Sequence, residues 1–388
     1  MSMKKLISLA ICFGLNWSSF ASMAKVKKVK GEVTKLSIGM REAVLLKEGD
    51  ALSKDTSLLS HDKSFAIIVY EDGTQVTLGP NSKIIIDKIE KTDQQFVSLL
   101  TGKIKAEVEK ATKEKKNSKM LVKTRSAALG VRGTVFQTTY NPESRITSLI
   151  TLRGKVAMAK MPEKAQVPTK VEAKQVLQTE TQQMDKLLNK SGVIVEKGEY
   201  SGVSDNLAHA TAPVSIAPEQ VAKLTLNKTL GATVEKFDQK IVEAQIVKTT
   251  KEMEEKAKTE TPIKEAKFDA KKEIYTPRPG GLVDIDSGVY VPPAKESAYI
   301  DNLNAFTATK KIGSLTEDGQ YIPPKGLKLE AGKGFVVTDE GQKSSETVVA
   351  SAKELNQDIA AQIIKPKKAK LEELEDDAYE KYFNADEL

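Results

Sequence analysis

The stretch Phe65-Ala-Ile-Ile-Val-Tyr70, followed by Glu71-Asp-Gly-Thr74 and Gln75-Val-Thr-Leu78, determines the fold class of this chain. Two runs rich in β-branched and aromatic residues flank an Asp-Gly pair, which is a strong short-range signal for a β-hairpin. We therefore predict a strand, a tight turn and a second strand over these fourteen residues.

More short strands are predicted beyond this hairpin. Gly79-Pro-Asn-Ser82 turns the chain, and seven β-branched runs follow at short spacing: 83–87, 95–100, 102–108, 120–124, 135–140, 146–152 and 155–159. Many short strands separated by glycine turns predict a sandwich, a barrel or a solenoid rather than a parallel α/β sheet.

Short turn and strand motifs punctuate these runs in a fixed order. The positions that carry them are Gly31, Val33, Gly49, Asp72, Gly73, Gly79, Pro80, Ser82, Gly102, Thr124, Gly130, Val131, Arg132, Gly133, Thr134, Gly154 and Val156. Together the motifs resemble the FecR domain, a family of bacterial periplasmic modules. The resemblance implies a FecR-type all-β domain, solenoid-like or roll-like, at residues 25–160.

The best-known members of this family are inner-membrane regulators that read an outer-membrane iron-transport receptor and control a sigma factor. We expect this sequence to lack the sigma-binding and transmembrane segments of those regulators. The resemblance therefore implies a β fold and a binding role in the envelope, with a direct relay into the cytoplasm in doubt.

Two glycines in the most specific motif have a physical reason to be glycine. Gly130 and Gly133 are expected either to adopt a positive φ or to lie close to a neighbouring strand. Arg132 between them is expected to make an internal ion pair or carbonyl contact, with presentation to a carboxylate or phosphate ligand as the alternative.

The first 24 residues resemble a secretory signal peptide. A charged start is followed by the apolar run Leu6 to Leu15 and by small residues, with cleavage expected after Ala21 or Ala24. The protein is therefore expected to be exported, to the periplasm or in association with the outer membrane. Removal of this segment also removes Cys12, the single cysteine, so the mature chain would have no disulfide and no thiolate site.

Composition separates the two halves of the chain. Aromatic residues make up 5% and charged residues 29%, and Lys/Glu/Thr/Ala stretches dominate after about residue 160. We expect a looser second half, with low-complexity, extended and C-terminally disordered parts. Its predicted divisions are closing strands and a linker at 161–225, a charged helical segment at 226–270, a Pro/Gly-containing repeat region at 271–330, and a C-terminal helix with a charged tail at 331–388.

Three helix signals stand out in this half. A helix is predicted to begin at Pro218, where proline suits the first turn. Val234, Phe237 and Ile241 would form an apolar stripe on a second helix, and Ser351-Ala-Lys-Glu354 has the form of a capping box that opens a third.

The repeat region contains a short duplication. Gly281 to Pro293 aligns with Gly313 to Pro324, and each copy has an acidic-Gly turn followed by Tyr-x-Pro-Pro. We expect extended polyproline-II segments, which serve either as exposed docking peptides or as spacers without a partner. The candidate docking residues are Tyr290, Pro292, Pro293, Tyr321, Pro323 and Pro324.

No motif indicates catalysis, a cofactor or a metal. Only His61 and His209 are present, and neither has metal-ligand spacing or an obvious partner. Nucleic-acid binding is also not expected, because the densest basic stretch, 110–119, contains no aromatic residue for stacking.

The sequence thus predicts a non-enzymatic exported protein that binds or scaffolds an envelope protein or a cell-wall component, without a transmembrane helix in the mature chain. The alternative is an accessory regulator of sigma-factor-type signalling, which would act through a separate partner such as an outer-membrane receptor or an inner-membrane regulator.

Overall fold

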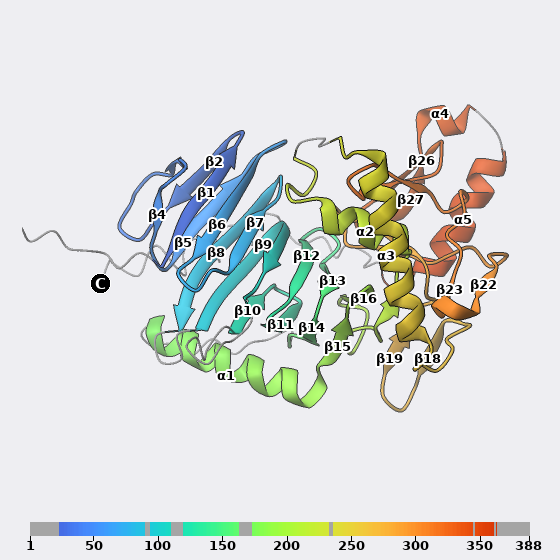
Figure 1. Cartoon of the computed structure of the whole chain (residues 1–388), viewed down its shortest axis with the longest axis horizontal. Helices are drawn as coiled ribbons and strands as arrows, with labels where there is room; N and C mark the ends of the chain where they lie inside the picture. Colours follow the sequence, from blue (N-terminus) through green and yellow to red (C-terminus); the bar gives the residue numbers. More distant parts are fainter. Residues whose placement is uncertain are drawn as a thin grey trace, which may run out of the picture.

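Seventeen strands of the first half form two facing sheets in the computed structural model, which describes residues 23–89, 94–109, 119–162, 173–232, 236–343, 346–360 and 362 (Figure 1). The strands are β1 Ala24–Lys30, β2 Val33–Leu36, β3 Val44–Leu45, β4 Ala51–Leu52, β5 Thr56–Ser60, β6 Phe65–Tyr70, β7 Gln75–Leu78, β8 Ser82–Ile89, β9 Gln94–Glu107, β10 Lys119–Lys123, β11 Ala127–Arg132, β12 Val135–Asn141, β13 Ile146–Arg153, β14 Lys155–Lys160, β15 Val193–Glu196, β16 Glu199–Val203 and β17 Val214–Ser215. The prediction of a mainly β, roll-like domain is confirmed.

The chain passes back and forth between the two sheets. Sheet A has the order β4-β1-β6-β7-β9-β12-β13-β16-β17, and sheet B has the order β3-β2-β5-β8-β9-β10-β11-β14-β15. Neighbouring strands are antiparallel, apart from the parallel pair β9 and β10. Strand β9 belongs to both sheets, because it pairs with β8 up to Thr101 and with β12 from Gly102 onward.

The space between the sheets is filled with apolar side chains. Residues at alternate positions of each strand point inward, as Ile104, Ala106 and Val108 do at the end of β9. Phe136 and Leu99 are fully buried among them. This alternation is the pattern that the sequence shows, and it explains why both sheets close over one core.

Helix α1, Ala173–Ser191, covers the outer face of sheet B. Its Met184 packs against Phe96 and Leu121, whose side chains point away from the inter-sheet core. The sequence analysis did not predict this helix, since it assigned the whole of 161–225 to closing strands and a linker.

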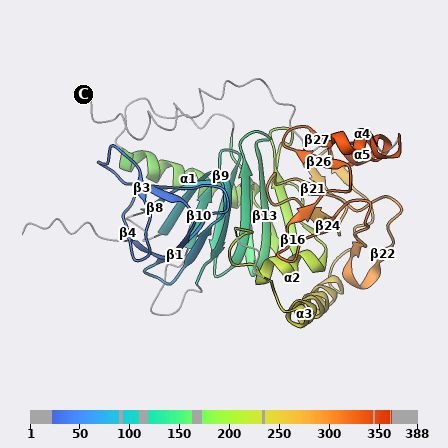
Figure 2. The ribbon, with the colours of Figure 1, turned by 90° about the horizontal axis from the view of Figure 1, so that it is seen from above.

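The second half packs on the outer face of sheet A (Figure 2). Its helices are α2 Pro218–Leu226, α3 Gln239–Ala257, η2 Asp301–Leu303, α4 Asp339–Gln342 and α5 Glu346–Ile359. Its strands form five two-stranded hairpins: β18 Lys267–Asp269 with β19 Ile274–Thr276, β20 Leu282–Val283 with β21 Tyr290–Val291, β22 Tyr299–Ile300 with β23 Ala305–Phe306, β24 Ser314–Leu315 with β25 Tyr321–Ile322, and β26 Leu327–Glu330 with β27 Gly334–Val337.

The expectation of a looser second half is wrong for the described residues. Leu282, Val291 and Phe335 of the hairpins share a core with Leu355 and Ile359 of α5. A second cluster joins α2 and the first repeat to sheet A. Short hairpins that bury few apolar groups individually therefore form a common interior.

Two of the helix boundaries also differ from the prediction. Phe237 precedes α3, which begins at Gln239 with Asp238 as its N-cap, so Phe237 and Ile241 do not share a helical stripe. Val234, the third predicted member, lies outside the described residues. Helix α5 begins at Glu346, which places Ser351 inside it rather than at its cap. The predicted start at Pro218 is confirmed for α2.

Three predicted segments lie wholly or mainly outside the described residues: the signal peptide, the basic stretch at 110–119 and the charged tail after Gln362. Among the helices that the structure does describe, none has the length and apolar character needed to cross a membrane.

Candidate functional site

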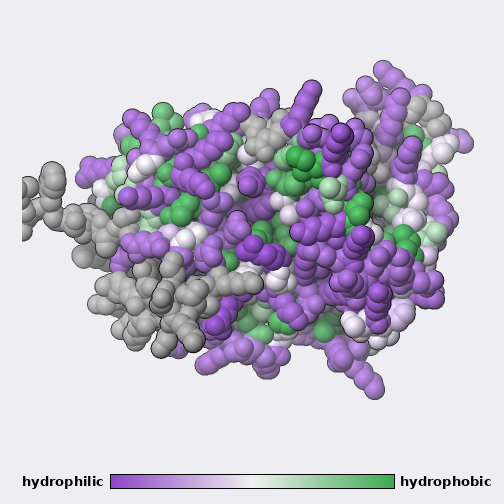
Figure 3. Space-filling model, in the orientation of Figure 1, coloured by the Kyte–Doolittle hydropathy of each residue, from purple (hydrophilic) through white to green (hydrophobic). Residues whose placement is uncertain are grey.

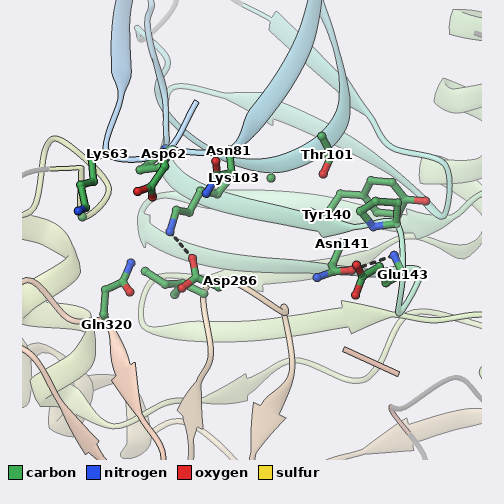
Figure 4. A pocket seen from close by; sticks show the side chains of 15 residues that line it. Asp62, Lys63, Asn81, Thr101, Lys103, Tyr140, Asn141, Glu143, Asp286 and Gln320 are labelled. Carbon is green, nitrogen blue, oxygen red and sulfur yellow. Dashed lines mark hydrogen bonds and ion pairs between the residues drawn. The ribbon is translucent and has the colours of Figure 1, made fainter. Parts of the chain in front are cut away.

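A cleft of about 410 Å³ lies where the β-sandwich meets the second half. The sandwich contributes residues 62–63, 80–81 and 140–143 at the ends of its strands and residues 101–103 in the middle of β9. The second half contributes Gly231, the turn of the first repeat at Ile285 and Asp286, and Gln320 of the second repeat. Residues more than 180 positions apart thus face one another across a polar cleft (Figure 4).

Two FecR motifs build the sandwich side of the cleft by interlocking. Ser60 Oγ donates to the carbonyl oxygen of Gly79 at 2.5 Å, and Ser82 Oγ accepts from the backbone N–H of Lys103 at 2.9 Å. Gly102, with φ of +84°, lies so close to this turn that a Cβ would stand 2.6 Å from the Asn81 carbonyl oxygen. The Gly79–Ser82 turn therefore requires glycine at the bend of β9.

Lys103 forms the base of the cleft. Its side chain is 5% exposed and pairs with Asp286, whose side chain is 63% exposed at the rim (Figure 4). The turn that carries Asp286 is held by its own backbone, since Gly288 N–H donates to the Asp284 carbonyl at 2.8 Å. The ammonium is thus the buried partner of the pair, and the carboxylate is the accessible one.

Lys105, two residues along β9, ties α2 to sheet A. Its Nζ donates to the carbonyl oxygens of Leu224, Thr225 and Asn227 at 2.8, 3.3 and 2.6 Å, at the C-terminal end of α2. These carbonyls have no partner inside the helix, and they favour a cation. Burial acts in the opposite direction and lowers the pKa of Lys105 to about 8.

Helix α2 also holds both repeats. Gln220 Nε2 donates to the carbonyl oxygens of Val283 at 2.7 Å and Gly319 at 3.2 Å. Asn227 Nδ2 donates to the carbonyl oxygen of Asp318 at 3.1 Å. The acidic-Gly turns of the two repeats are therefore brought to the same side of the cleft by one helix.

The remaining cleft residues are polar side chains on tight turns. Asn141 Oδ1 accepts from the N–H of Glu143 at 2.9 Å and fixes the turn between β12 and β13. Tyr140 ends β12, and burial raises its pKa to about 12. Amides and carboxylates from both halves, together with lysines of the sandwich, thus surround a space that can hydrogen-bond a polar chain.

Most FecR motif residues shape the scaffold. Asp72 accepts from the N–H and hydroxyl of Thr74 at 2.8 and 2.9 Å, and Thr124 Oγ1 meets Thr147 Oγ1 at 2.6 Å. Val33, Val131 and Val156 are buried. Of the predicted motif positions, the cleft brings together Pro80 and Gly102.

A positive φ explains one of the two glycines near Arg132, and a close neighbour explains the other. Gly133 has φ of +66°, whereas a Cβ on Gly130 would lie 3.0 Å from Leu188 Cδ1 of α1. The neighbour that excludes a side chain at Gly130 is therefore a helix rather than a strand.

Arg132 itself does not make the internal contact that we expected. Its side chain is exposed at the end of β11, where it points away from the core. Among the described residues it has no ion pair, so the expected internal pairing is wrong and the outward-facing alternative remains a prediction.

The expected exposure of the Tyr-x-Pro-Pro elements is also wrong. Tyr290 is fully buried, stacks on Tyr200 with ring centroids 4.9 Å apart, and donates to the Arg278 carbonyl at 2.5 Å. Tyr321 is buried in the same way and donates to the Ile312 carbonyl. Each tyrosine closes its hairpin, so neither copy is an extended segment.

The prolines follow their tyrosines. Pro292 and Pro293 are buried, and Pro323 and Pro324 are half-buried. Gln362 further covers the first copy, because its amide accepts from Tyr290 N–H at 3.1 Å and donates to the Tyr290 carbonyl at 2.9 Å. Docking through these residues would require the hairpins to open.

Sequence reasoning missed Lys103, Lys105, Asp286 and Gln220. Lys103 and Lys105 alternate with apolar residues in a strand, which is typical of a solvent-facing side. Their partners come from the second half, and no local pattern reveals such a long-range contact. The duplication was the available signal, since it marked Asp286 as part of a repeated turn.

Neither histidine lines the cleft, although His61 precedes the cleft residue Asp62 and its carbonyl accepts from the N–H of Asn81 at 3.3 Å. His61 Nε2 is 3.8 Å from Glu32 Oε1 on an exposed turn. Across the ranges that the structure describes, no group of three or more His, Cys, Asp or Glu side chains is placed to hold a metal ion.

Comparisons with known proteins bear on the sandwich. Residues 57–157 match the model of a family described as FecR protein. The chain also matches two crystal structures of a candidate anti-sigma factor from Parabacteroides distasonis, at 2.50 and 1.65 Å resolution. Each match has 17% identity and a TM-score of 0.28, and covers 38% of this chain and 55% of the solved chain.

The chain therefore spans about half the length of those solved chains. No curated protein matches it. The family match covers the hairpin, the Gly79–Ser82 turn, the bend of β9 and the motif around Arg132. The resemblance inferred from the motifs is confirmed: residues 57–157 carry a FecR domain.

Proposed function

We propose that this chain is a non-catalytic regulator of signalling across a membrane, exported to the cell envelope and acting through a separate membrane protein. The observation that carries the proposal is the FecR match at 57–157, which contains the turns that build the sandwich side of the cleft. This match favours the regulator over the envelope scaffold, because regulators of this kind are the best-known proteins with that module.

The cleft is the proposed place of contact with the partner. Asn81, Asn141 and Gln320 offer amides that can hydrogen-bond the backbone of a bound segment. Lys103 offers a charge whose present partner, Asp286, is accessible. A carboxylate of the partner can therefore exchange with Asp286 without leaving the lysine unpaired, and this exchange would couple binding to the contact between the two halves.

A photo-crosslinking amino acid placed at Asn81 tests this proposal in living cells. We expect one membrane protein to be captured at Asn81 and not at the matched exposed control position Lys251 on α3. The same capture should weaken when Lys103→Met removes the cation with which the partner's carboxylate would pair. Identical capture patterns at both positions would contradict the role of the cleft, and unchanged sigma-factor-dependent transcription in a deletion strain would contradict the regulator itself.

A second candidate, the envelope scaffold, retains one observation in its favour. The hydroxyls of Thr101 and Tyr140 and the amides of the cleft also suit a cell-wall saccharide. Calorimetric titration of the purified protein with cell-wall fragments separates the two candidates. Saturable binding of the fragments that is lost in Asn141→Ala would favour the scaffold. If the fragments release no heat while the crosslink to the membrane protein is still captured, the regulator is favoured.

A further inference from the structure

Four lysines of β1 lie on the outer face of sheet A near its edge, beside Phe65 and Ile67, which pack against Ala232 (Figures 1 and 2). They are Lys25, Lys27, Lys28 and Lys30, and all four are exposed. In a regular strand, side chains alternate between faces, so at most three of these six positions would share a side. The register instead shifts between Val26 and Lys28, and this bulge leaves Lys27 unpaired with β6.

The bulge therefore directs all four ammonium groups outward. Lys25 lies opposite Val69, Lys28 opposite Ile67 and Lys30 opposite Phe65, residues of β6 whose side chains are on the outer face. Lys27 reaches Gln75 of β7 on the same face, with Nζ 3.1 Å from Oε1. The inward positions of β1 remain apolar, since Ala24 and Val26 enter the core.

No carboxylate neutralises this group among the described residues. Lys27 contacts an amide, and Lys28 lies over the Phe65 ring at 5.7 Å. The Glu48 carboxylate bonds to the backbone of β1 instead of to a lysine, because it accepts from the N–H of Val29 at 3.2 Å. The four charges are thus concentrated on about 20 Å of strand.

Exposed apolar side chains occur at the same end of the sandwich as β1 (Figure 1). Ile38, Val44 and Leu45 are 56%, 39% and 60% exposed, on β3 and the loop before it, and β3 is the edge strand of sheet B. Figure 3 shows a mainly hydrophilic surface over the sandwich with small apolar patches, so large exposed aliphatic side chains are uncommon there. The lysines thus belong to sheet A and the aliphatic groups to sheet B, at the same end of the sandwich (Figure 2).

We infer that this end of the sandwich docks on an anionic phospholipid membrane. An open sheet face with flexible lysines suits an extended negative surface, because it has no concave pocket and no arginine fork for one defined anion. Apolar side chains at the same end of a domain as a basic face can add to the binding by entering the lipid interface. The inference does not depend on the cleft or on its partner.

Sedimentation with lipid vesicles tests this inference on the full chain without its predicted signal peptide (residues 25–388). We expect binding to vesicles of equal parts phosphatidylglycerol and phosphatidylethanolamine, and little binding to phosphatidylcholine. Replacing the four β1 lysines by glutamine should lower the partition coefficient by roughly tenfold or more. The matched control replaces four exposed lysines of the α3 region, Lys240, Lys248, Lys251 and Lys258, and removes the same charge.

The apolar contribution is measured separately with Ile38→Ser and Leu45→Ser. These changes should weaken binding in high salt, where the lysine contribution is screened. Thermal unfolding of each variant verifies that the sandwich is intact. Equal loss in the β1 and α3 variants, equal binding to both lipids, or competition by soluble polyphosphate at the same charge concentration would overturn the inference.

Discussion

The interior between the two sheets and the seam with the second half are held by different kinds of contact. The interior is apolar, and its strands pair largely with neighbours in the sequence. The seam contains buried lysines and amides whose partners lie 63 or more residues away, as in Gln220 with Val283 and Lys105 with Leu224. The interior therefore sets the fold, whereas the seam sets the relation between the halves and forms the cleft.

The largest expected loss of stability comes from the interior. Phe136→Ala should lower the free energy of unfolding by about 3–5 kcal/mol, because the ring is fully buried between the sheets. Chemical denaturation measures the change. The control Ile194→Ala removes an exposed side chain and should cost less than about 0.5 kcal/mol. Similar losses for both variants would mean that the interior is not close-packed.

The bend of β9 should give the next largest effect. Gly102→Ala combines a positive φ with a Cβ only 2.6 Å from a backbone oxygen, and should cost about 2–3 kcal/mol. Gly39→Ala is the matched control, since it has a φ of +79° and no atom within 4 Å of the added Cβ. We expect about 1 kcal/mol for the control, measured in the same denaturation series. Equal losses of unfolding free energy in both variants would mean that the positive φ alone, and not the contact with the Gly79–Ser82 turn, explains the glycine at 102.

At the seam, Lys105→Met should lower the free energy of unfolding by about 1–3 kcal/mol at neutral pH. The methionine keeps the length of the chain but leaves three carbonyl groups of α2 without their donor. Lys228→Met, at an exposed neighbouring position, should change stability by less than about 0.5 kcal/mol. A neutral Lys105→Met would show that water satisfies these carbonyls equally well.

The same lysine predicts a pH dependence. Its pKa is about 8 in the folded protein and 10.5 when unperturbed, so the unfolded chain binds more protons between these values. The stability of the wild type should therefore rise from pH 8 to 10, by up to about 2 kcal/mol relative to Lys105→Met. Denaturation curves of both proteins across this range measure the difference. If the stability difference between the two proteins does not change with pH, the three carbonyls stabilise the charged lysine enough to offset its burial.

The smallest effect is expected at Gly130, a motif glycine without a positive φ. Gly130→Ala should cost less than about 1 kcal/mol, because the end of the flexible Leu188 side chain can move away from the added methyl group. In a Leu188→Ala background the cost should vanish. A persisting cost in the double variant would place the constraint in β11 rather than in α1.

The sequence was sufficient for the interior because strand patterning and turn glycines act locally. The hairpin at 65–78 and the Gly79–Ser82 turn follow from neighbouring residues alone. Helix α1 was missed, since its apolar side chains Met184, Leu187 and Leu188 find their partners on the outer face of sheet B only after the sheet has formed. The hairpins of the second half were also missed, because each contains two to four residues per strand and gains stability from the shared core.

Only one side of the cleft could be predicted from the sequence. Its sandwich side uses motif positions that the sequence shows, at Pro80 and Gly102. Its other side depends on Asp286 and Gln320, whose positions follow from the packing of α2 between the repeats. The buried tyrosines illustrate the same limit, since Tyr290 and Tyr321 donate to carbonyls of the residues just before their hairpins, Arg278 and Ile312, which a linear motif does not reveal.

The passage of β9 through both sheets has a consequence for the order of folding. This strand pairs with β7, β8, β10 and β12, which together span residues 75–141, so either sheet can add its outer strands only after this central group has formed. The amides of β9 should consequently exchange with deuterium last, and strands such as β3 and β4, at the far edges, should exchange first.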